Sequence, residues 1–190
     1  MIDNYFDSET YTKIDFTKTQ IKKGEYDDCT FLNCNFENIH ASNIQFVACE
    51  FIDCNFSNTN VKDTAFRDVQ FIRCKMVGVK MNECDSFLLQ MSFKDCQLNF
   101  SSFYQLKIPN TTFVKCNLQE VDFTETSVNK SLFDNCDLKN TIFERTNLEK
   151  ANFITSINFD IDPSNNHLKG AKFSKENVVG LLVKYGVKIE

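Results

Sequence analysis

The sequence contains few of the residues from which catalytic and nucleotide-binding motifs are built. Its 190 residues include only 5 Gly, 2 Pro and 2 His, and no Trp. So few glycines make a phosphate-cradling loop implausible, and no GxSxG or HExxH motif supplies a nucleophile or a zinc site. We expect His40, at a polar repeat position, and His167, in a loop, to be solvated. These absences predict a protein that is not an enzyme and that has no cofactor or metal.

Long apolar runs and export signals are also absent. No stretch approaches the about 18 consecutive apolar residues of a membrane-spanning helix, and no basic-then-apolar leader is present. We therefore expect no membrane association and a cytoplasmic location. The formal net charge is −5, with the acidic residues concentrated toward the N-terminal half. Because a basic surface is lacking, direct binding to DNA or RNA is not expected.

Phenylalanine, by contrast, is abundant and regularly spaced. Nearly all of the 20 Phe lie on a five-residue grid that starts at Phe6. Other large apolar residues fill the grid up to Met81, where it slips by two residues, and it resumes from Leu88 to Phe153. A period of five matches neither the 3.6 of an α-helix nor the 2 of a β-strand. A short internal repeat of this kind indicates a solenoid.

A second period of 20 residues, or four repeats, predicts one turn of that solenoid. Like residues then stack on like residues in successive coils, with a rise of about 4.8 Å per coil, as between hydrogen-bonded strands. One column is expected to form the central ladder of the core. Its members are Phe31, Phe51, Phe71, Phe93, Phe113, Phe133 and Phe153.

All 9 Cys lie two residues before a grid position, in a place otherwise filled mostly by Thr, Ser, Val or Ala, where for Cys84 the first count of five is continued to Ser86. We expect this compact position to face inward as well, while the other three residues of each repeat face water. No CxxC pair is present to indicate a zinc or redox motif. Cysteines one coil apart would lie within disulfide distance, but their parallel stacking and a reducing compartment favour buried free thiols.

The slip in the grid falls at residues 84–87. An insertion into a solenoid bulges from one corner without stopping the coils on either side, so residues 1–160 are predicted to form two stacked subdomains that meet at this break. Phe87 lies off the grid. It either plugs the junction between the subdomains or points outward, and we favour the plug.

Residues 161–190 are predicted to form a C-terminal capping and dimerisation segment. After a turn-rich link, Ser174 is a suitable N-cap for a helix from Lys175 to Tyr185 that stops at Gly186. The segment either only covers the last coil or also pairs with a twofold copy, and we favour pairing because it has more apolar surface than one coil end needs. The expected dimerisation residues are Val178, Leu181, Leu182, Tyr185, Val187 and Ile189.

Several repeats resemble the A(D/N)LXX motif of pentapeptide-repeat proteins. Among them are residues 34–38, with the sequence CNFEN, and residues 151–155, with the sequence ANFIT. The resemblance covers most of the chain and is specific because the motif recurs so often. It implies an all-β solenoid, the right-handed quadrilateral β-helix of that family, with a short C-terminal helix.

Within that family the overall plan is similar to the quinolone-resistance (Qnr) group. The shared features are a stack with a mid-body irregularity, the segment 168–173 and a short helix that contains Leu181 and Leu182. The resemblance implies a homodimer formed through the C-terminus. It also implies a DNA-mimicking rod that binds DNA gyrase or topoisomerase IV and relieves fluoroquinolone poisoning. Unlike many members of the group, this chain has no sizeable loop, only the two-residue slip.

The alternative function is that of a structural scaffold for another protein partner. An outward row just after the phenylalanine ladder is rich in aliphatic residues, and the break at 84–87 adds a second irregular surface. Scattered exposed apolar residues need no functional explanation, so the row is either incidental or a contact stripe. The candidate partner contacts are Leu32, Ile52, Ile72, Asp85 and Phe87.

Overall fold

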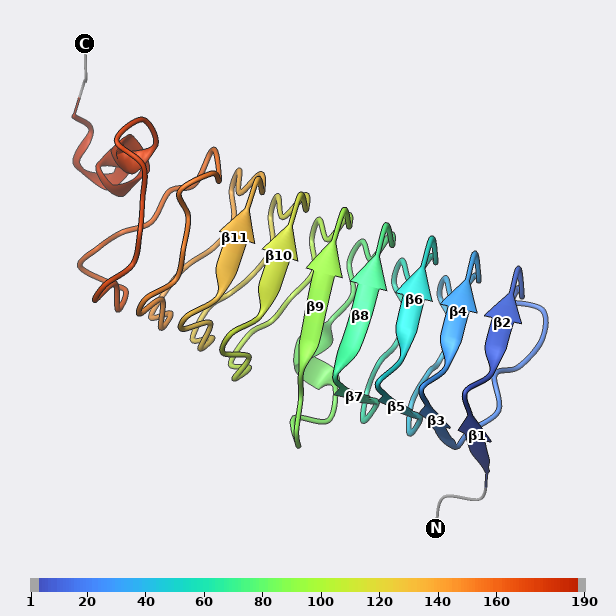
Figure 1. Cartoon of the computed structure of the whole chain (residues 1–190). Coiled ribbons are helices and arrows are strands. Elements are labelled where there is room, and N and C mark those ends of the chain that lie inside the picture. The colour runs from blue at the N-terminus through green and yellow to red at the C-terminus, as the bar shows by residue number, and fades with distance from the viewer. Residues whose placement is uncertain (1–3, 188–190) are drawn as a thin grey trace.

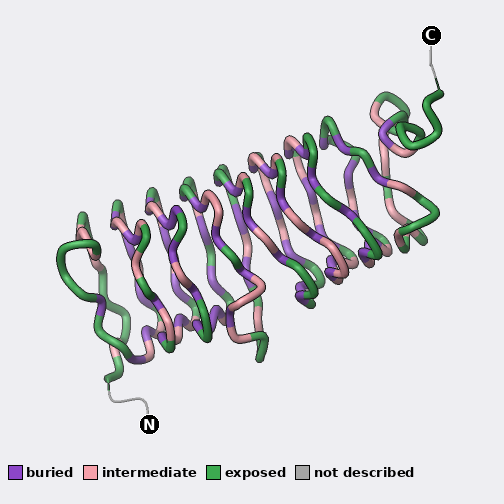
Figure 2. The backbone as a smooth tube through the Cα atoms, turned by 180° about the vertical axis from the view of Figure 1, so that it is seen from behind, coloured by how far each residue is buried: buried purple, intermediate pink, exposed green. Residues whose placement is uncertain are grey.

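The computed structural model describes residues 4–187 and forms a rod of stacked coils, with the two ends of the chain at opposite ends of the rod (Figure 1). Short parallel strands and isolated parallel bridges connect each coil to the next. The predicted all-β solenoid is therefore confirmed. The backbone tube in Figure 2 shows buried residues recurring between exposed ones around the inner coils, as expected for a repeat with two inward positions, whereas the terminal coils are more exposed.

The strands form two sheets. The first has the order β1-β3-β5-β7 and the second the order β11-β10-β9-β8-β6-β4-β2. The first sheet consists of β1 (Tyr5–Asp7), β3 (Glu25–Asp27), β5 (Gln45–Val47) and β7 (Ala65–Arg67). The second consists of β2 (Thr10–Thr12), β4 (Thr30–Leu32), β6 (Glu50–Ile52), β8 (Val69–Ile72), β9 (Met91–Lys94), β10 (Thr112–Val114) and β11 (Leu132–Asp134).

We number the four faces of the rod by their columns of inward residues. The first face begins with Phe6, Tyr26, Phe46 and Phe66, and the second carries Tyr11 and the ladder from Phe31 onward. The third begins with Phe16, Phe36, Phe56 and Met76, and the fourth with Ile21, Ala41, Val61 and Met81. A short 3-10 helix, η1 (Met81–Glu83), lies on the fourth face just before the break.

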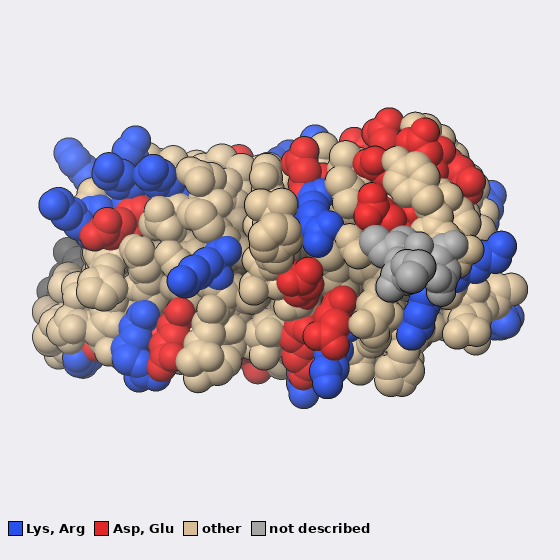
Figure 3. All heavy atoms as spheres, turned by 90° about the horizontal axis from the view of Figure 1, so that it is seen from below, with Lys and Arg blue, Asp and Glu red and all other residues tan. Residues whose placement is uncertain are grey.

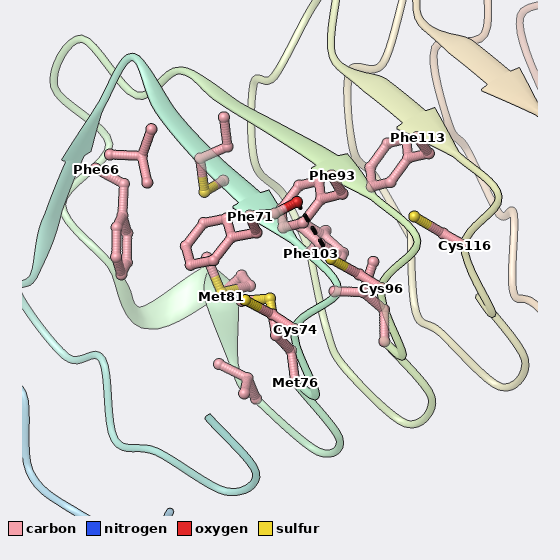
Figure 4. Close-up of a cluster of buried hydrophobic side chains, with 14 of the residues drawn as sticks. Phe66, Phe71, Cys74, Met76, Met81, Phe93, Cys96, Phe103, Phe113 and Cys116 are labelled. Carbon is pink, nitrogen blue, oxygen red and sulfur yellow. Dashed lines mark hydrogen bonds between the residues drawn. The ribbon is translucent and has the colours of Figure 1, made fainter. Parts of the chain in front are cut away.

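The phenylalanine ladder runs through the second face without interruption. Its seven rings are at most 1% exposed, and neighbouring rings stack nearly parallel. The ring centroids of Phe31 and Phe51 are 4.8 Å apart, and those of Phe93 and Phe113 are 5.1 Å apart. Figure 4 shows how the ring of Phe93 continues the stack from Phe71 across the break. Each ring is thus removed from water and packs against the coils above and below. This burial of apolar surface is the main contribution to the stability of such a core.

The compact position two residues before each large inward residue of the grid has a role beyond filling space. Thr126 Oγ1 donates a hydrogen bond to the carbonyl oxygen of Phe103, 2.8 Å away in the preceding coil. Cys54 Sγ makes the equivalent contact with the carbonyl oxygen of Phe31 at 3.3 Å. All nine cysteines are buried and free. Thr, Ser and Cys therefore share this position because each combines small size with a donor for a buried backbone carbonyl.

The corners of the coils explain the abundance of Asn and Asp. Most corners contain one residue with a positive φ, often Asn or Asp, such as Asn58 at 53° and Asn140 at 58°. These two residue types tolerate the left-handed region better than other non-glycine residues. Many turns are also closed by a side chain, as where Ser57 donates its backbone N–H to Asn55 Oδ1 at 3.0 Å. The polar positions of the repeat thus specify the turns.

The break corrects two expectations. Phe87 is 65% exposed and Leu88 is 66% exposed, so Phe87 does not plug the junction and Leu88 is not a grid residue. Asp85 still bridges Ala65 in the old register, and Met91 pairs with Val69 in the new one. The residues between Asp85 and Met91 form a loop that projects outward from the rod. Leu89 and Met91 pack against the core there, whereas Phe87 and Leu88 are exposed to solvent.

The coils also continue beyond the expected boundary at residue 160. Lys172 bridges Asn152, and the ring of Phe173 stacks on that of Phe153 with the centroids 5.3 Å apart. Residues 167–173 therefore belong to the last coil, and the capping segment starts at Ser174. The periodicity was hidden because the link at 160–166 interrupts the grid before it returns.

The capping segment is helical, but its helix type differs from the expected single helix over 175–185. It contains two 3-10 helices, η2 (Val178–Leu181) and η3 (Val183–Tyr185), and ends at Gly186 with a φ of 61°. Ser174 accepts the backbone N–H of Asn177 as an N-cap would, at 3.1 Å. A Cβ at Gly180 would lie 2.5 Å from the ring of Phe159. This close approach packs the segment against the core.

Candidate functional site

The described part of the chain offers no obvious chemical centre. Within residues 4–187 no group of three or more His, Cys, Asp or Glu is placed to hold a metal ion, and no helix there is long and apolar enough to cross a membrane. His40 and His167 are both exposed. The candidate sites are therefore surfaces, and four of them can be compared.

The first surface is the tip of the bulge, formed by Phe87 and Leu88. Arg67 holds this tip from below, since its Nη1 donates to Gln45 Oε1 at 2.8 Å and its Nη2 lies 3.6 Å from Asp85 Oδ2. The same guanidinium lies 5.6 Å from the centre of the Phe87 ring, within range of a cation–π interaction. The Phe87 N–H is donated to Asp85 Oδ1 at 3.0 Å. The tip is thus a small, fixed apolar knob on the first face.

The second surface is the aliphatic row. Leu32, Ile52 and Ile72 lie in register on the outside of the second sheet, and Lys94 follows them. All three aliphatic side chains are only partly exposed. The row lies on the second face and the bulge on the first, with the corner at Asp68 between them. The five candidate contacts that the sequence suggested therefore belong to two surfaces.

The third surface is the capping segment. Val178 is 39% exposed, Leu182 37%, Tyr185 58% and Val187 55%, so these side chains form an apolar patch at the end of the rod. Leu181, in contrast, packs against the core and belongs to the cap. Ile189 lies outside the described residues. Sequence reasoning missed Val179 and Val183, which are exposed as well, because it assumed a single α-helix with one apolar face.

Beside the capping segment lies an open groove of about 1120 Å³. Ile142, Ile157 and Val183 line it together with the ion pair between Asp162 and Lys184. The hydrogen bond from Lys184 lowers the pKa of Asp162, so the carboxylate remains charged and committed to this pair. The groove offers neither a nucleophile with an adjacent base nor an unpaired buried charge, and we assign it no chemistry.

The fourth surface is defined by charge. Viewed from the side of β1, β3, β5 and β7, the rod carries a group of acidic side chains near its N-terminal end, with basic side chains around them, and a group of mainly basic side chains at its C-terminal end (Figure 3). Asp7, Asp27 and Asp28 lie near the N-terminal end of this face, whereas Lys150 and Lys169 lie near the other. The uneven distribution of acid along the sequence thus becomes a polarity along one edge of the rod.

Comparison with known proteins supports the family resemblance. The family model described as "Pentapeptide repeat region" matches residues 24–86 and 82–153. The curated proteins contain no significant match to the sequence. Among solved structures, a trypsin-treated form of QnrB1, a plasmid-mediated fluoroquinolone resistance protein, aligns with a TM-score of 0.77 at 12% identity and covers 98% of this chain and 92% of that chain.

The full-length form of QnrB1 aligns with a TM-score of 0.56 at 15% identity, over 97% of this chain and 100% of that chain. At these identities the likeness concerns the fold, which is shared from end to end. The match to the family model establishes the family, because the matched residues span most of the rod and include the ladder from Phe31 to Phe153. The chain belongs to the pentapeptide repeat family.

Proposed function

We propose that this protein is a non-enzymatic rod that binds a type II topoisomerase, DNA gyrase or topoisomerase IV, in place of DNA. The observation that carries the proposal is the end-to-end structural match to QnrB1, a fluoroquinolone resistance protein. The acidic side chains near the N-terminal end of the first face support it. The chain would bind through its surface alone, and would relieve fluoroquinolone poisoning by displacing DNA.

Within this proposal the bulge is the contact that gives specificity. Acidic side chains attract many basic surfaces, but a fixed apolar knob requires a matching pocket. Phe87 and Leu88 are the most exposed large apolar side chains of the described residues, and Arg67 holds their loop in place. The knob takes the place of the larger loops that this chain lacks.

The capping segment supplies a second part of the proposal, a homodimer formed end to end. Its exposed residues Val178, Leu182, Tyr185 and Val187 form an apolar patch where a twofold copy would bury them. Light scattering of the full chain and of a Leu182→Glu, Tyr185→Glu variant tests this. We expect the variant to be monomeric at a concentration where the native chain is dimeric, and equal masses would contradict the end-to-end dimer.

The topoisomerase proposal is tested by DNA supercoiling with purified gyrase, with and without ciprofloxacin. We expect the native protein to inhibit supercoiling or to restore it in the presence of the drug. A Phe87→Ala, Leu88→Ala variant should lose most of this effect. An Ile142→Ala, Ile154→Ala variant removes two other exposed apolar side chains and should keep it. No effect of the native protein at micromolar concentrations would remove the topoisomerase as partner.

The second candidate function is a scaffold for another protein, favoured by the in-register row of Leu32, Ile52 and Ile72. Three aliphatic side chains on the flat outer side of a sheet form a surface that a partner can cover. A partner of this kind should be captured by the native chain and lost when the three residues are replaced by Lys. Capture that survives the substitutions would assign the binding to another face.

A further inference from the structure

The corner between the first and second faces carries charges of opposite sign at its two ends. The coils pair in register along the whole second face. The corner residues that lie two positions before the paired residues Thr10, Thr30, Glu50 and their successors therefore form one continuous row. In chain order the row is Ser8, Asp28, Ala48, Asp68, Gln90, Asn110, Lys130, Lys150 and Gly170. This first row thus passes from acidic to basic along the rod. The adjacent row has Asp7 and Asp27 at its N-terminal end, but at its other end Glu149 accompanies Lys169.

These charges are available to a partner. Asp7, Asp28, Lys130, Lys150 and Lys169 are all exposed. Among the ion pairs of residues 4–187, none involves any of these five side chains. The exceptions to the polarity are few. Arg67, in the acidic half, is held by Asp85, and Glu149 lies between the lysines.

The apolar knob at Phe87 and Leu88 lies midway between the two charged ends. Each member of the row marks one coil, which we call a layer. Four layers precede that of Gln90 and four follow it, and the knob projects from the layer of Gln90. A twofold axis that crosses the first face at this layer would place the N-terminal half of one rod over the C-terminal half of another. Asp7 would then face Lys169, and Asp28 would face Lys150, two pairs of opposite charge. Asp27 would face Glu149, and Lys130 would face Ala48, so the pairs of Asp7 with Lys169 and of Asp28 with Lys150 carry the complementarity.

We propose that the first face pairs with the same face of a second copy of this chain, with the two rods side by side and antiparallel. Charge complementarity selects this partner, because the face is its own electrostatic complement only when one copy is reversed. A parallel arrangement would set Asp28 against Asp28 and Lys150 against Lys150, which is repulsive. In the antiparallel pair the two knobs meet at the twofold axis and exclude water from its centre.

This lateral pair is distinct from the end-to-end dimer, since it uses charges and a different surface. Exposed ion pairs are screened by salt, whereas the patch on the capping segment is apolar. Sedimentation of the full chain at about 0.02 M and about 0.5 M salt therefore separates the two. We expect a salt-sensitive doubling of mass at low salt, in addition to any association through the C-terminus.

Charge reversal makes the test specific. Lys130→Glu, Lys150→Glu and Lys169→Glu together should weaken the lateral pair by roughly tenfold or more. Mixing this variant with one carrying Asp7→Lys, Asp27→Lys and Asp28→Lys should restore a heterodimer. The matched control is Lys75→Glu, Lys94→Glu and Lys115→Glu, which changes the net charge equally at exposed positions on other parts of the surface. Equal loss in the control would overturn the proposal.

Carbodiimide crosslinking supplies a direct readout. Asp28 and Lys150 of one chain lie six layers apart, or about 29 Å at 4.8 Å per layer, too far for a zero-length bond. An Asp28–Lys150 crosslink at low salt can therefore form only between two copies, and its absence would overturn the proposal. A single change, Leu88→Glu, places like charges on both sides of the axis and should abolish the crosslink. The crosslinking experiment contains no gyrase, so its outcome does not depend on the proposed topoisomerase binding. Because both proposals use Phe87 and Leu88, the lateral pair and the topoisomerase would compete for this surface.

Discussion

The coils before the bulge and the coils after it fill the same cross-section with different side chains. One coil before the bulge buries three rings, Tyr26, Phe31 and Phe36, and its fourth inward residue is Ala41. One coil after the bulge buries two rings, Phe113 and Phe123, together with Leu118 and Val128. In the first of these coils a methyl group accompanies three rings, whereas two aliphatic side chains accompany the two rings of the other. The fourth position is not fixed, since Val61 accompanies Phe46, Phe51 and Phe56 in the coil that follows Ala41. A close-packed core limits the side-chain volume that each coil can hold.

The arrangement of the rings changes with their number. Before the bulge, rings on neighbouring faces meet edge to face, as for Phe31 and Phe36 at 5.7 Å and 66°. After it, rings on opposite faces do so, as for Phe113 and Phe123 at 5.9 Å and 82°. The ladder on the second face is common to both halves. The bulge therefore lies where one packing pattern gives way to another, and only the second face continues unchanged across it.

The backbone shows the same division. The first face is a four-stranded sheet up to β7 and is reduced to isolated bridges afterwards, such as Lys107 with Ser127. Pro109 follows the inward residue Ile108 on this face and has no N–H to donate. The second sheet, which carries the ladder, runs through both halves. The common ladder is thus the element whose loss should affect both halves equally.

The largest expected effect is therefore on the ladder. Phe113→Ala removes a fully buried ring between Phe93 and Phe133 and should lower the free energy of unfolding by about 3–5 kcal/mol. Phe51→Ala, in the half with more rings, should cost a similar amount. Urea unfolding of both variants measures this. The control Lys115→Ala changes an exposed neighbour and should have an effect of at most about 0.5 kcal/mol, and a loss as large as that of Phe113→Ala would mean that the register is wrong.

The volume rule predicts a smaller effect at the fourth face. Ala41→Leu adds volume to a coil that already holds three rings and should cost about 1–3 kcal/mol. Adding Phe36→Leu converts this coil to the two-ring pattern and should recover part of the loss. A double-mutant cycle in urea unfolding reveals the coupling. Additive losses at these two positions would show that the halves do not share a volume constraint.

The hydrogen bond at the compact position should contribute less to the free energy of unfolding than a ring of the ladder. Thr126→Val removes the donor to the Phe103 carbonyl oxygen while it keeps the shape, and should cost about 1–3 kcal/mol. Thr126→Ser keeps the donor and should cost less than the Val variant, although it is smaller. Cys54→Ser before the bulge should behave like Thr126→Ser. If the Val variant were the more stable of the two, packing alone would explain this position.

The smallest effect at neutral pH concerns the thiols. Burial raises the pKa of Cys49 and of Cys84 to about 12, above the value of about 8.5 expected in the unfolded chain. The unfolded state therefore releases protons first, so stability is unaffected at low pH and declines as the pH rises from about 9 toward 12. Denaturation at several alkaline pH values measures the decline. Iodoacetamide at neutral pH should leave the native thiols unmodified, and rapid modification would contradict their burial.

Most of the fold could be predicted from the spacing of residues. The five-residue period identifies the inward side chains, and the twenty-residue period identifies which of them touch, so Phe31 on Phe51 follows from counting. The exposed residues of the capping segment were predicted less well. Leu181 packs against the core beside Gly180, which lies close to Phe159, a contact between residues that no periodicity relates.

The sequence by itself thus determined the solenoid, its stacked core and the buried state of the thiols, because each of these depends on a local rule repeated many times. Only the tertiary structure decided where the two extra residues at the break go, which makes Phe87 a knob instead of a plug. It also decided that the acidic and basic charges share one edge. These features depend on competition between particular side chains for one space and on the register of distant coils, and neither is encoded in a single repeat.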